Sequence, residues 1–503
     1  MTSLLAPLFE QPNELPSMRA RVLATFILCL FAFATLWDRY ATAGVLQSIE
    51  EYYDVDDTLG GLLQLAFVVA SIFAALVLGW AGDRMNRRWL LLISCWLWFV
   101  FSAAASFIPA NMFWIFMLSR SLAAVGEAAI STFGPAMMAD YFSGKARNYS
   151  IMAFYICYTL GITFSIIVGT VLVDATVPWQ WALRIAPIFG LPTIVLCQLF
   201  LQEPPRGASD GERIEEHDKG NVLRDTFDIF RTKSVTLIII ATACKNFYTR
   251  AYAWFGTSLA LNAMNYLGND TSTVWHGLSY SSVSGIMGML SMVAALTGAG
   301  ALVFVARLWR DRGFPCCARG GSKRGPALAV AIATTVSIPF FFLLGSSMTW
   351  DVYLGVVGAW FAPFLSSGSS PVLVEMMMTV LSPDRRSRAN ALSHVVQCIT
   401  GDGPAPFITG ALSVAFRDAL QENGDAYAKY FGLVYALNIG LVISTFGSGL
   451  FFIVGWFYPK DISDREAFVA LQAKMRGRKA ADHSATDYSS FASSVNLSET
   501  SED

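Results

Sequence analysis

The chain has 503 residues, of which 54% are apolar and only 14% are charged, and its formal net charge is −2. Soluble globular proteins carry about 25% charged residues, so this composition argues against a cytosolic enzyme or a disordered scaffold. The nearly neutral charge gives no basis for binding nucleic acid. A polytopic α-helical membrane protein remains, because a helix satisfies its own backbone hydrogen bonds in lipid.

Twelve apolar stretches are long enough to cross a membrane, for which about 20 residues are needed. In chain order they are 22–47, 58–80, 89–107, 112–139, 149–173, 181–201, 234–263, 277–306, 326–346, 352–381, 389–416 and 431–457. We therefore predict an all-α membrane protein with four parts. These are an N-terminal six-helix bundle over 1–201, a cytoplasmic linker over 202–233, a C-terminal six-helix bundle over 234–460, and a disordered, serine-rich cytoplasmic tail over 461–503.

The distribution of lysine and arginine predicts the orientation. If the amino terminus lies in the cytoplasm, the inner segments hold 28 of the 35 basic residues and the outer loops hold only Arg417 and Lys429. Cytoplasmic loops carry such an excess, so we expect both termini inside. The outer loop after the seventh span contains the sequon Asn269-Asp270-Thr271, and we expect Asn269 to be glycosylated.

A basic motif follows the second span, over residues 79–88, and matches the pattern Gly-x3-Asp-Arg-x2-Arg-Arg. This pattern resembles the signature of the major facilitator superfamily, and the resemblance implies two six-helix bundles that rock about a central site by alternating access. In this motif we expect the glycine to permit close helix approach and the charged residues to form an inner gate and anchor at anionic headgroups. The residues concerned are Gly79, Asp83, Arg84, Arg87 and Arg88. The alternative is a plain positively charged inner loop.

Ionisable residues within the spans are functional candidates, because charge is costly in hydrocarbon. They are Asp38, Arg39, Arg120, Glu127, Lys245, Arg250, Glu375 and Asp402. Arg120 and Glu127 are seven residues apart, which places them on one helix face about 10.5 Å apart. We expect Glu127, near mid-depth, to exchange protons, and we expect Arg120, Lys245 and Arg250 to offer positive charge to an anionic substrate. Four acids oppose four bases, so the alternative is a set of purely structural ion pairs.

The eleventh span contains a break signal, Gly401-Asp402-Gly403-Pro404. Glycine and proline at membrane depth free backbone groups that need other partners, so Gly401, Asp402 and Pro404 are candidates for a gate, with a packing kink as the alternative. No P-loop, metal-ligand spacing or nucleophile elbow occurs in the sequence. We therefore expect neither an enzyme nor a cofactor or bound metal.

Several motifs together resemble the spinster family of lysolipid and sphingolipid transporters. They are Asp38-Arg39-Tyr40 followed by Ala43-Gly44-Val45-Leu46, Gly61-Leu62-Leu63-Gln64, Arg120-x6-Glu127, and Ser393-His394 with Gly401-Asp402. The resemblance implies proton-linked or facilitated movement of single-chain lipids. It further implies that Asp38 and Glu127 couple protons, and that Arg39 and Arg120 hold the lipid headgroup.

The expected partners are thus a lysophospholipid or phosphorylated sphingoid base, protons and the bilayer, with the chain acting as a monomer. Tyr488-Ser-Ser-Phe491 fits a sorting signal, which favours the late endosome or lysosome, with the plasma membrane second. Two other functions stay open. One is transport of soluble organic anions or amphipathic drugs, and the other is a transport-silent signalling or scaffold protein.

Overall fold

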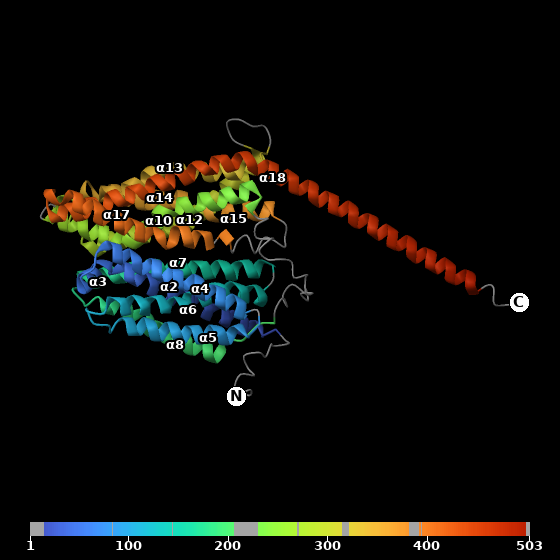
Figure 1. Ribbon diagram of the computed structural model, residues 1–503, viewed down its shortest axis with the longest axis horizontal. Coiled ribbons are helices and arrows are strands. Elements are labelled where there is room, and N and C mark those ends of the chain that lie inside the picture. Colours follow the sequence, from blue (N-terminus) through green and yellow to red (C-terminus); the bar gives the residue numbers. More distant parts are fainter. Residues whose placement is uncertain are drawn as a thin grey trace.

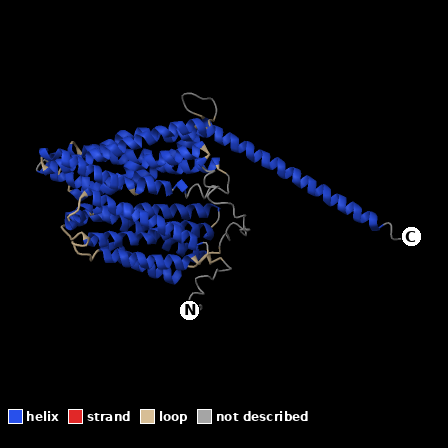
Figure 2. Ribbon diagram, in the orientation of Figure 1, coloured by secondary structure: helices blue, strands red, loops and turns tan. Residues whose placement is uncertain are grey.

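The fold is almost wholly helical (Figure 2). The computed structural model describes residues 15–82, 84–142, 144–205, 230–268, 271–313, 321–381, 392–393 and 395–498. Asp83, Asn269 and residues 206–229 of the predicted linker lie outside the described residues.

The described residues of the first half form six long helices and one short one. The long helices are α2 (Met18–Gly44), α4 (Asp57–Gly82), α5 (Arg87–Ala105), α6 (Phe113–Tyr141), α7 (Gly144–Asp174) and α8 (Gln180–Phe200), and the short helix α3 (Leu46–Tyr53) lies between α2 and α4. Each long helix coincides with one predicted span.

The second half is built in the same way but is more interrupted. Its helices are α10 (Lys233–Leu267), α11 (Thr271–Val274), α12 (Tyr280–Arg312), α13 (Gly325–Ser346), α14 (Val352–Ser367), α15 (Ser369–Val380), α17 (Pro404–Leu420) and α18 (Asp425–Ser498). The predicted tenth span is divided into α14 and α15. In the eleventh span, a π-helical turn, η3 (Cys398–Asp402), precedes α17.

Ten helical segments in the described part of the chain are long and apolar enough to cross a membrane. The two remaining predicted spans correspond to α10, whose polar residues include Lys245 and Arg250, and to α17, which has only 17 residues. Helix α10 therefore differs from the other spans in its charged residues, and α17 differs in its shortness. Both helices pack against α4 or α2 of the first half.

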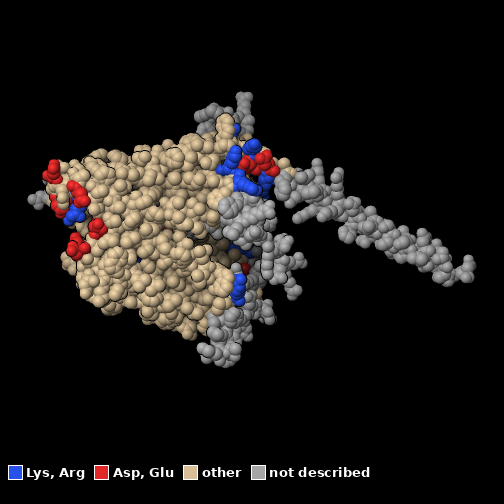
Figure 3. Space-filling view, in the orientation of Figure 1, with Lys and Arg blue, Asp and Glu red and all other residues tan. Residues whose placement is uncertain are grey.

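The two halves lie side by side with their long helices roughly aligned, α3 at one end and both termini at the other (Figure 1). Helix α4 packs against α17 and α7 packs against α12 across the boundary. On the face that Figure 3 shows, the middle is almost free of charge, whereas Lys and Arg gather at the end opposite α3, which we call the terminal end, and Asp and Glu dominate the α3 end. The predicted two-bundle architecture is confirmed.

The two halves close tightly at the α3 end. A Cβ at Gly61 would overlap the backbone at Pro406, and one at Gly410 would overlap the carbonyl of Asp57. The Trp254 indole of α10 donates to the carbonyl oxygen of Gly60 at 3.1 Å. We call this contact of α4 with α10 and α17 the α3-end seam. At the opposite end the surface is hollowed between the halves (Figure 3).

Two expectations from the sequence differ from the structure. A Cβ at Gly79 would meet nothing within 4 Å, and the close approach on this turn is made instead by Gly82 against the Phe133 ring of α6. The tail predicted to be disordered is helical from residue 461 to Ser498, as a continuation of α18. Residues 465–476 are rich in strong helix formers and no proline follows Pro459, so the helix continues past the last span.

Candidate functional site

A cavity of about 300 Å³ lies between the halves. Its walls come from α2, α4, α6 and α7 of the first half and from the η3 region of the second. Most of the lining surface is apolar, but seven polar side chains line the cavity, namely Arg39, Ser71, Glu127, Ser131, Thr132, Tyr158 and Asp402. A cavity with a few convergent polar groups is the usual form of a small-molecule site.

The N-terminal wall of the cavity is organised by an ion pair. Nη1 of Arg39 lies 2.6 Å from Oε1 of Glu127, and the Tyr158 hydroxyl donates to the same oxygen at 3.3 Å. The other oxygen, Oε2, is buried and has no hydrogen-bond partner among the described residues. The Arg39 guanidinium also lies over the Phe67 ring, 5.0 Å from its centroid. Glu127 thus has one oxygen engaged and one available for a proton.

The C-terminal wall carries a second pair. Nε of Arg250 lies 2.8 Å from Oδ1 of Asp402. Asp402 ends the π-helical turn, and Pro404, which has no N–H to donate, starts α17 two residues later. Such turns are frequent at functional sites. The predicted break in the eleventh span is therefore present, and it brings a carboxylate to the cavity.

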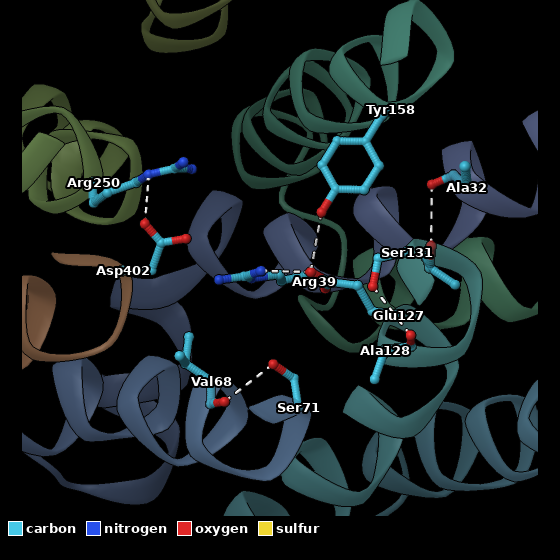
Figure 4. Close-up of polar contacts among 11 residues, drawn as sticks. Ala32, Arg39, Val68, Ser71, Glu127, Ala128, Ser131, Tyr158, Arg250 and Asp402 are labelled. Atoms are coloured by element: carbon cyan, nitrogen blue, oxygen red, sulfur yellow. Dashed lines mark hydrogen bonds and ion pairs between the residues drawn. The ribbon is translucent and has the colours of Figure 1, made fainter. Parts of the chain in front are cut away.

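The two pairs face one another across the boundary between the halves. Arg39 lies between the carboxylates of Glu127 and Asp402 (Figure 4), and the Asp402 charge acts on Arg39 as well. The Arg250 side chain remains 36% exposed. Two guanidiniums and two carboxylates thus lie together at the boundary between the halves, and their formal charges balance.

Asp38 and Arg120 form a separate, deeper pair. Oδ1 of Asp38 accepts from Nη1 of Arg120 at 2.8 Å and from Ser102 at 2.5 Å, and Oδ2 accepts from Trp98 at 3.0 Å. Asp38 is 1% exposed and Arg120 is 2% exposed. The spacing that puts Arg120 and Glu127 on one face of α6 is correct, but each meets a different residue of α2. Asp38 and Arg120 join α2, α5 and α6 outside the central cavity.

Lys245 is also separated from the cavity. Its Nζ donates to Oγ of Ser369 at 2.7 Å, at the point where α15 begins, and the side chain is buried. A Cβ added at Gly401 would make only ordinary van der Waals contact with the Ala243 carbonyl oxygen of α10. Of the four basic residues predicted for a headgroup, the structure therefore brings together Arg39 and Arg250.

The arginines of the basic motif after α4 contact other residues of the first half. Arg87 bridges Asp140 of α6 at 2.7 Å and Glu203, which follows α8, at 2.8 Å. Arg88 donates to the Gln198 carbonyl oxygen at 2.8 Å. Arg84 is exposed and lies over the Trp80 ring, 4.4 Å from its centroid. This geometry ties α5 to α6 and α8 at the terminal end.

Sequence reasoning missed Tyr158 and a second cavity. The second cavity, of about 290 Å³, is bounded by α7, α10, α12, α13 and α14, and its lining surface is mostly apolar, with hydroxyl groups but no charged side chain. Its lining includes Ile162, Ile166, Met287, Met292, Phe341 and Leu344. Hydropathy marks all these residues as membrane-embedded but does not distinguish a cavity wall from a lipid-facing surface. The described residues contain no group of three or more side chains suited to a metal ion.

Comparisons with known proteins agree with this architecture. The family model of the Major Facilitator Superfamily matches residues 28–401. The chain is 28% identical over 441 residues to protein spinster homolog 1 of Bos taurus, covering 86% of this chain and 80% of that protein. It is 29% identical over 470 residues to protein spinster homolog 3 of Danio rerio, covering 90% and 87%. It is 28% identical over 458 residues to the sphingosine-1-phosphate transporter SPNS2 of Danio rerio, covering 89% and 86%.

Solved structures share the fold. The crystal structure of a bacterial homolog of the human lysosomal transporter Spinster, in an inward-facing and unoccupied conformation, has a TM-score of 0.71 at 18% identity, covering 89% of this chain and 99% of that one. A D-xylose–proton symporter has a TM-score of 0.59 at 14% identity, covering 85% and 97%. The expected resemblance to spinster proteins is confirmed. The chain belongs to the major facilitator superfamily, and it is a multi-pass membrane transporter, not an enzyme.

Proposed function

We propose that this protein is a proton-coupled secondary transporter that moves single-chain lipids, lysophospholipids or sphingolipids, by alternating access. The observation that carries the proposal is the position of a charged cavity beside an apolar one. Tyr158 lines the charged cavity and Thr159 lines the apolar one, so both cavities flank the same turn of α7. A headgroup and a hydrocarbon chain need these two environments side by side.

The headgroup is assigned to Arg250 and Arg39. Arg250 is partly exposed, and guanidiniums bind phosphate and carboxylate through paired hydrogen bonds. Arg120 and Lys245, expected for the same task, are buried against Asp38 and Ser369 and support the fold around the site. The hydrocarbon chain occupies the apolar cavity, where the methionines adapt to chains of different shape.

The proton is assigned to Glu127. Protonation at the unpartnered Oε2 removes the negative charge that holds Arg39, so the guanidinium becomes available to an anionic headgroup. Loss of the proton restores the ion pair and expels the headgroup. Asp38, expected as a second coupling residue, already accepts hydrogen bonds from three side chains and is the weaker candidate.

The orientation proposed is the one predicted by the basic residues, with both termini cytoplasmic. The α3-end seam then closes the outer side and the hollow faces the cytoplasm, which is an inward-facing state. We assign Asp83, Arg84, Arg87 and Arg88 to the inner gate and the break at Gly401, Asp402 and Pro404 to its hinge. The proposed location is the late endosome or lysosome, with the plasma membrane second, and the proposed functional unit is the monomer.

Uptake into proteoliposomes tests the proposal. Labelled lysophosphatidylcholine, lysophosphatidylethanolamine, sphingosine-1-phosphate and soluble organic anions are offered with and without an imposed pH gradient. We expect lipid uptake that rises with the gradient. Uptake confined to the soluble anions would indicate a general anion carrier instead of a lipid carrier. No uptake of any compound would favour a scaffold protein.

The matched variant is Glu127→Gln, which keeps the shape of the side chain but binds no proton. We expect it to abolish gradient-driven uptake while the protein remains folded. Glu375→Gln is the control, because Glu375 pairs with Arg310 at 2.9 Å outside the cavity. Equal loss of folded protein in both variants would favour the structural ion-pair interpretation.

A further inference from the structure

Glu50 is a buried carboxyl outside the central cavity. It lies on α3 with 8% of its surface exposed, and its Oε1 is buried with no hydrogen-bond partner among the described residues. A Cβ added at Gly60 of α4 would overlap this oxygen. Because Gly60 has no side chain, the Glu50 carboxyl fits against α4 in this position.

The Glu50 carboxyl lies at the α3-end seam. The carbonyl oxygen of Gly60 accepts the hydrogen bond from Trp254 of α10. Close by on α4, Oδ2 of Asp57 accepts from the Ser413 hydroxyl of α17 at 2.7 Å. The carboxyl is therefore buried at a place where the two halves of the molecule meet, and separation of the halves would give it access to water.

The charges around Glu50 oppose its ionisation. Glu51 on its own helix and Asp56 and Asp57 at the start of α4 add negative charge, and Arg417 of α17 is the opposing cation. Helix α10 also packs against α3. Its residue at this place is the uncharged Trp254, which bonds to Gly60. Burial first, and then the three carboxylates, raise the pKa of Glu50 well above its usual range.

We infer that Glu50 is a second proton-binding site, distinct from Glu127, and that its protonated form holds the α3-end seam closed. The inference rests on the alternating access proposed above. A carboxyl that binds a proton more tightly in the closed state favours closure at low pH, and this stabilisation is lost as the pH rises through its raised pKa. With the termini cytoplasmic, acid on the outer or lumenal side therefore drives the carrier inward-facing.

Hydrogen–deuterium exchange of the full-length protein in lipid nanodiscs tests the inference without substrate. Exchange of residues 46–60 and 404–420 is followed between pH 5 and pH 8 and corrected for the intrinsic rate. We expect seam opening to increase about tenfold for each pH unit by which the pKa of closed-state Glu50 exceeds its open-state value. Glu50→Gln, neutral and of the same shape, is expected to keep the low-pH protection throughout, and Glu50→Met is a second neutral variant.

Two controls separate this site from its surroundings and from the transport proposal. Glu51→Gln removes an exposed carboxylate from the same helix and should retain the pH dependence. Glu127→Gln should retain it as well, even though it abolishes coupled uptake. An unchanged pH dependence in both Glu50 variants would overturn the inference. Because the readout needs no transported substrate, this result is distinguishable from failure of lipid uptake.

Discussion

Two carboxylates near the centre of the first half, Asp38 and Glu127, have the same charge and different surroundings. Asp38 has donors on both oxygens, whereas Glu127 has donors on one. A buried charge that is fully paired contributes to a stable framework, and a half-paired one is suited to change its protonation state. The different roles of Asp38 and Glu127 therefore follow from the hydrogen-bond donors around each carboxylate.

Asp38→Asn is expected to destabilise the protein more than Glu127→Gln. Removal of one partner leaves the buried Arg120 charge uncompensated, which costs about 3–5 kcal/mol. Thermal unfolding of the purified variants should show the larger decrease in Tm for Asp38→Asn. The double variant Asp38→Leu/Arg120→Met, which removes both charges, should recover part of the loss. Equal Tm values for the two single variants would contradict this view of the site.

The contact between α4 and α17 depends on glycines. A Cβ added at Gly410 would overlap the Asp57 carbonyl, and a backbone carbonyl cannot turn aside as a long side chain can. This pair of helices is therefore sensitive to a single methyl group. The same length of helix with alanine would hold the two halves apart at the α3 end.

Gly410→Ala is expected to reduce transport severalfold by hindering closure of the seam. Gly449→Ala is the matched control, since a Cβ there would meet nothing within 4 Å, and it should transport as the unchanged protein does. Uptake assays at equal amounts of folded protein compare the two. Normal transport by Gly410→Ala would show that closure tolerates the added methyl group.

On the face of the molecule that Figure 3 shows, charge gathers at the two ends and the middle is uncharged, which fits the orientation that the basic loops predict. In glycosylating cells we expect a mass shift on glycosidase treatment that is lost in Asn269→Gln. Two further sequons, at Asn148 and Asn496, lie on the side that we predict to be cytoplasmic and should stay unmodified. Asn148→Gln should therefore keep the shift. A shift that depends on Asn148 instead would reverse the orientation.

Bilayer thickness explains why the spans could be predicted from the sequence and the site only in part. Thickness fixes the length of an apolar segment, so helix positions follow from hydropathy. The neighbours of a side chain depend on how helices pack, which is why Arg120 and Glu127 share a face but no partner. The motif likewise marked Gly79, while the close contact is at Gly82. The role of Tyr158 could not be predicted from the sequence, because a tyrosine in an apolar span can face lipid, a neighbouring helix or a cavity.

The balance of Arg39 and Arg250 against Glu127 and Asp402 has a consequence for the membrane potential. An empty site has no net charge, so its return across the bilayer is insensitive to voltage. A proton together with a headgroup of charge −1 also sums to zero. A proton with a zwitterionic headgroup leaves one positive charge, worth about 2.3 kcal/mol per 100 mV if it crosses the whole field. Current recordings on proteoliposomes would thus distinguish a lysophosphatidylcholine carrier, which generates current, from a carrier of singly anionic lipids, which does not.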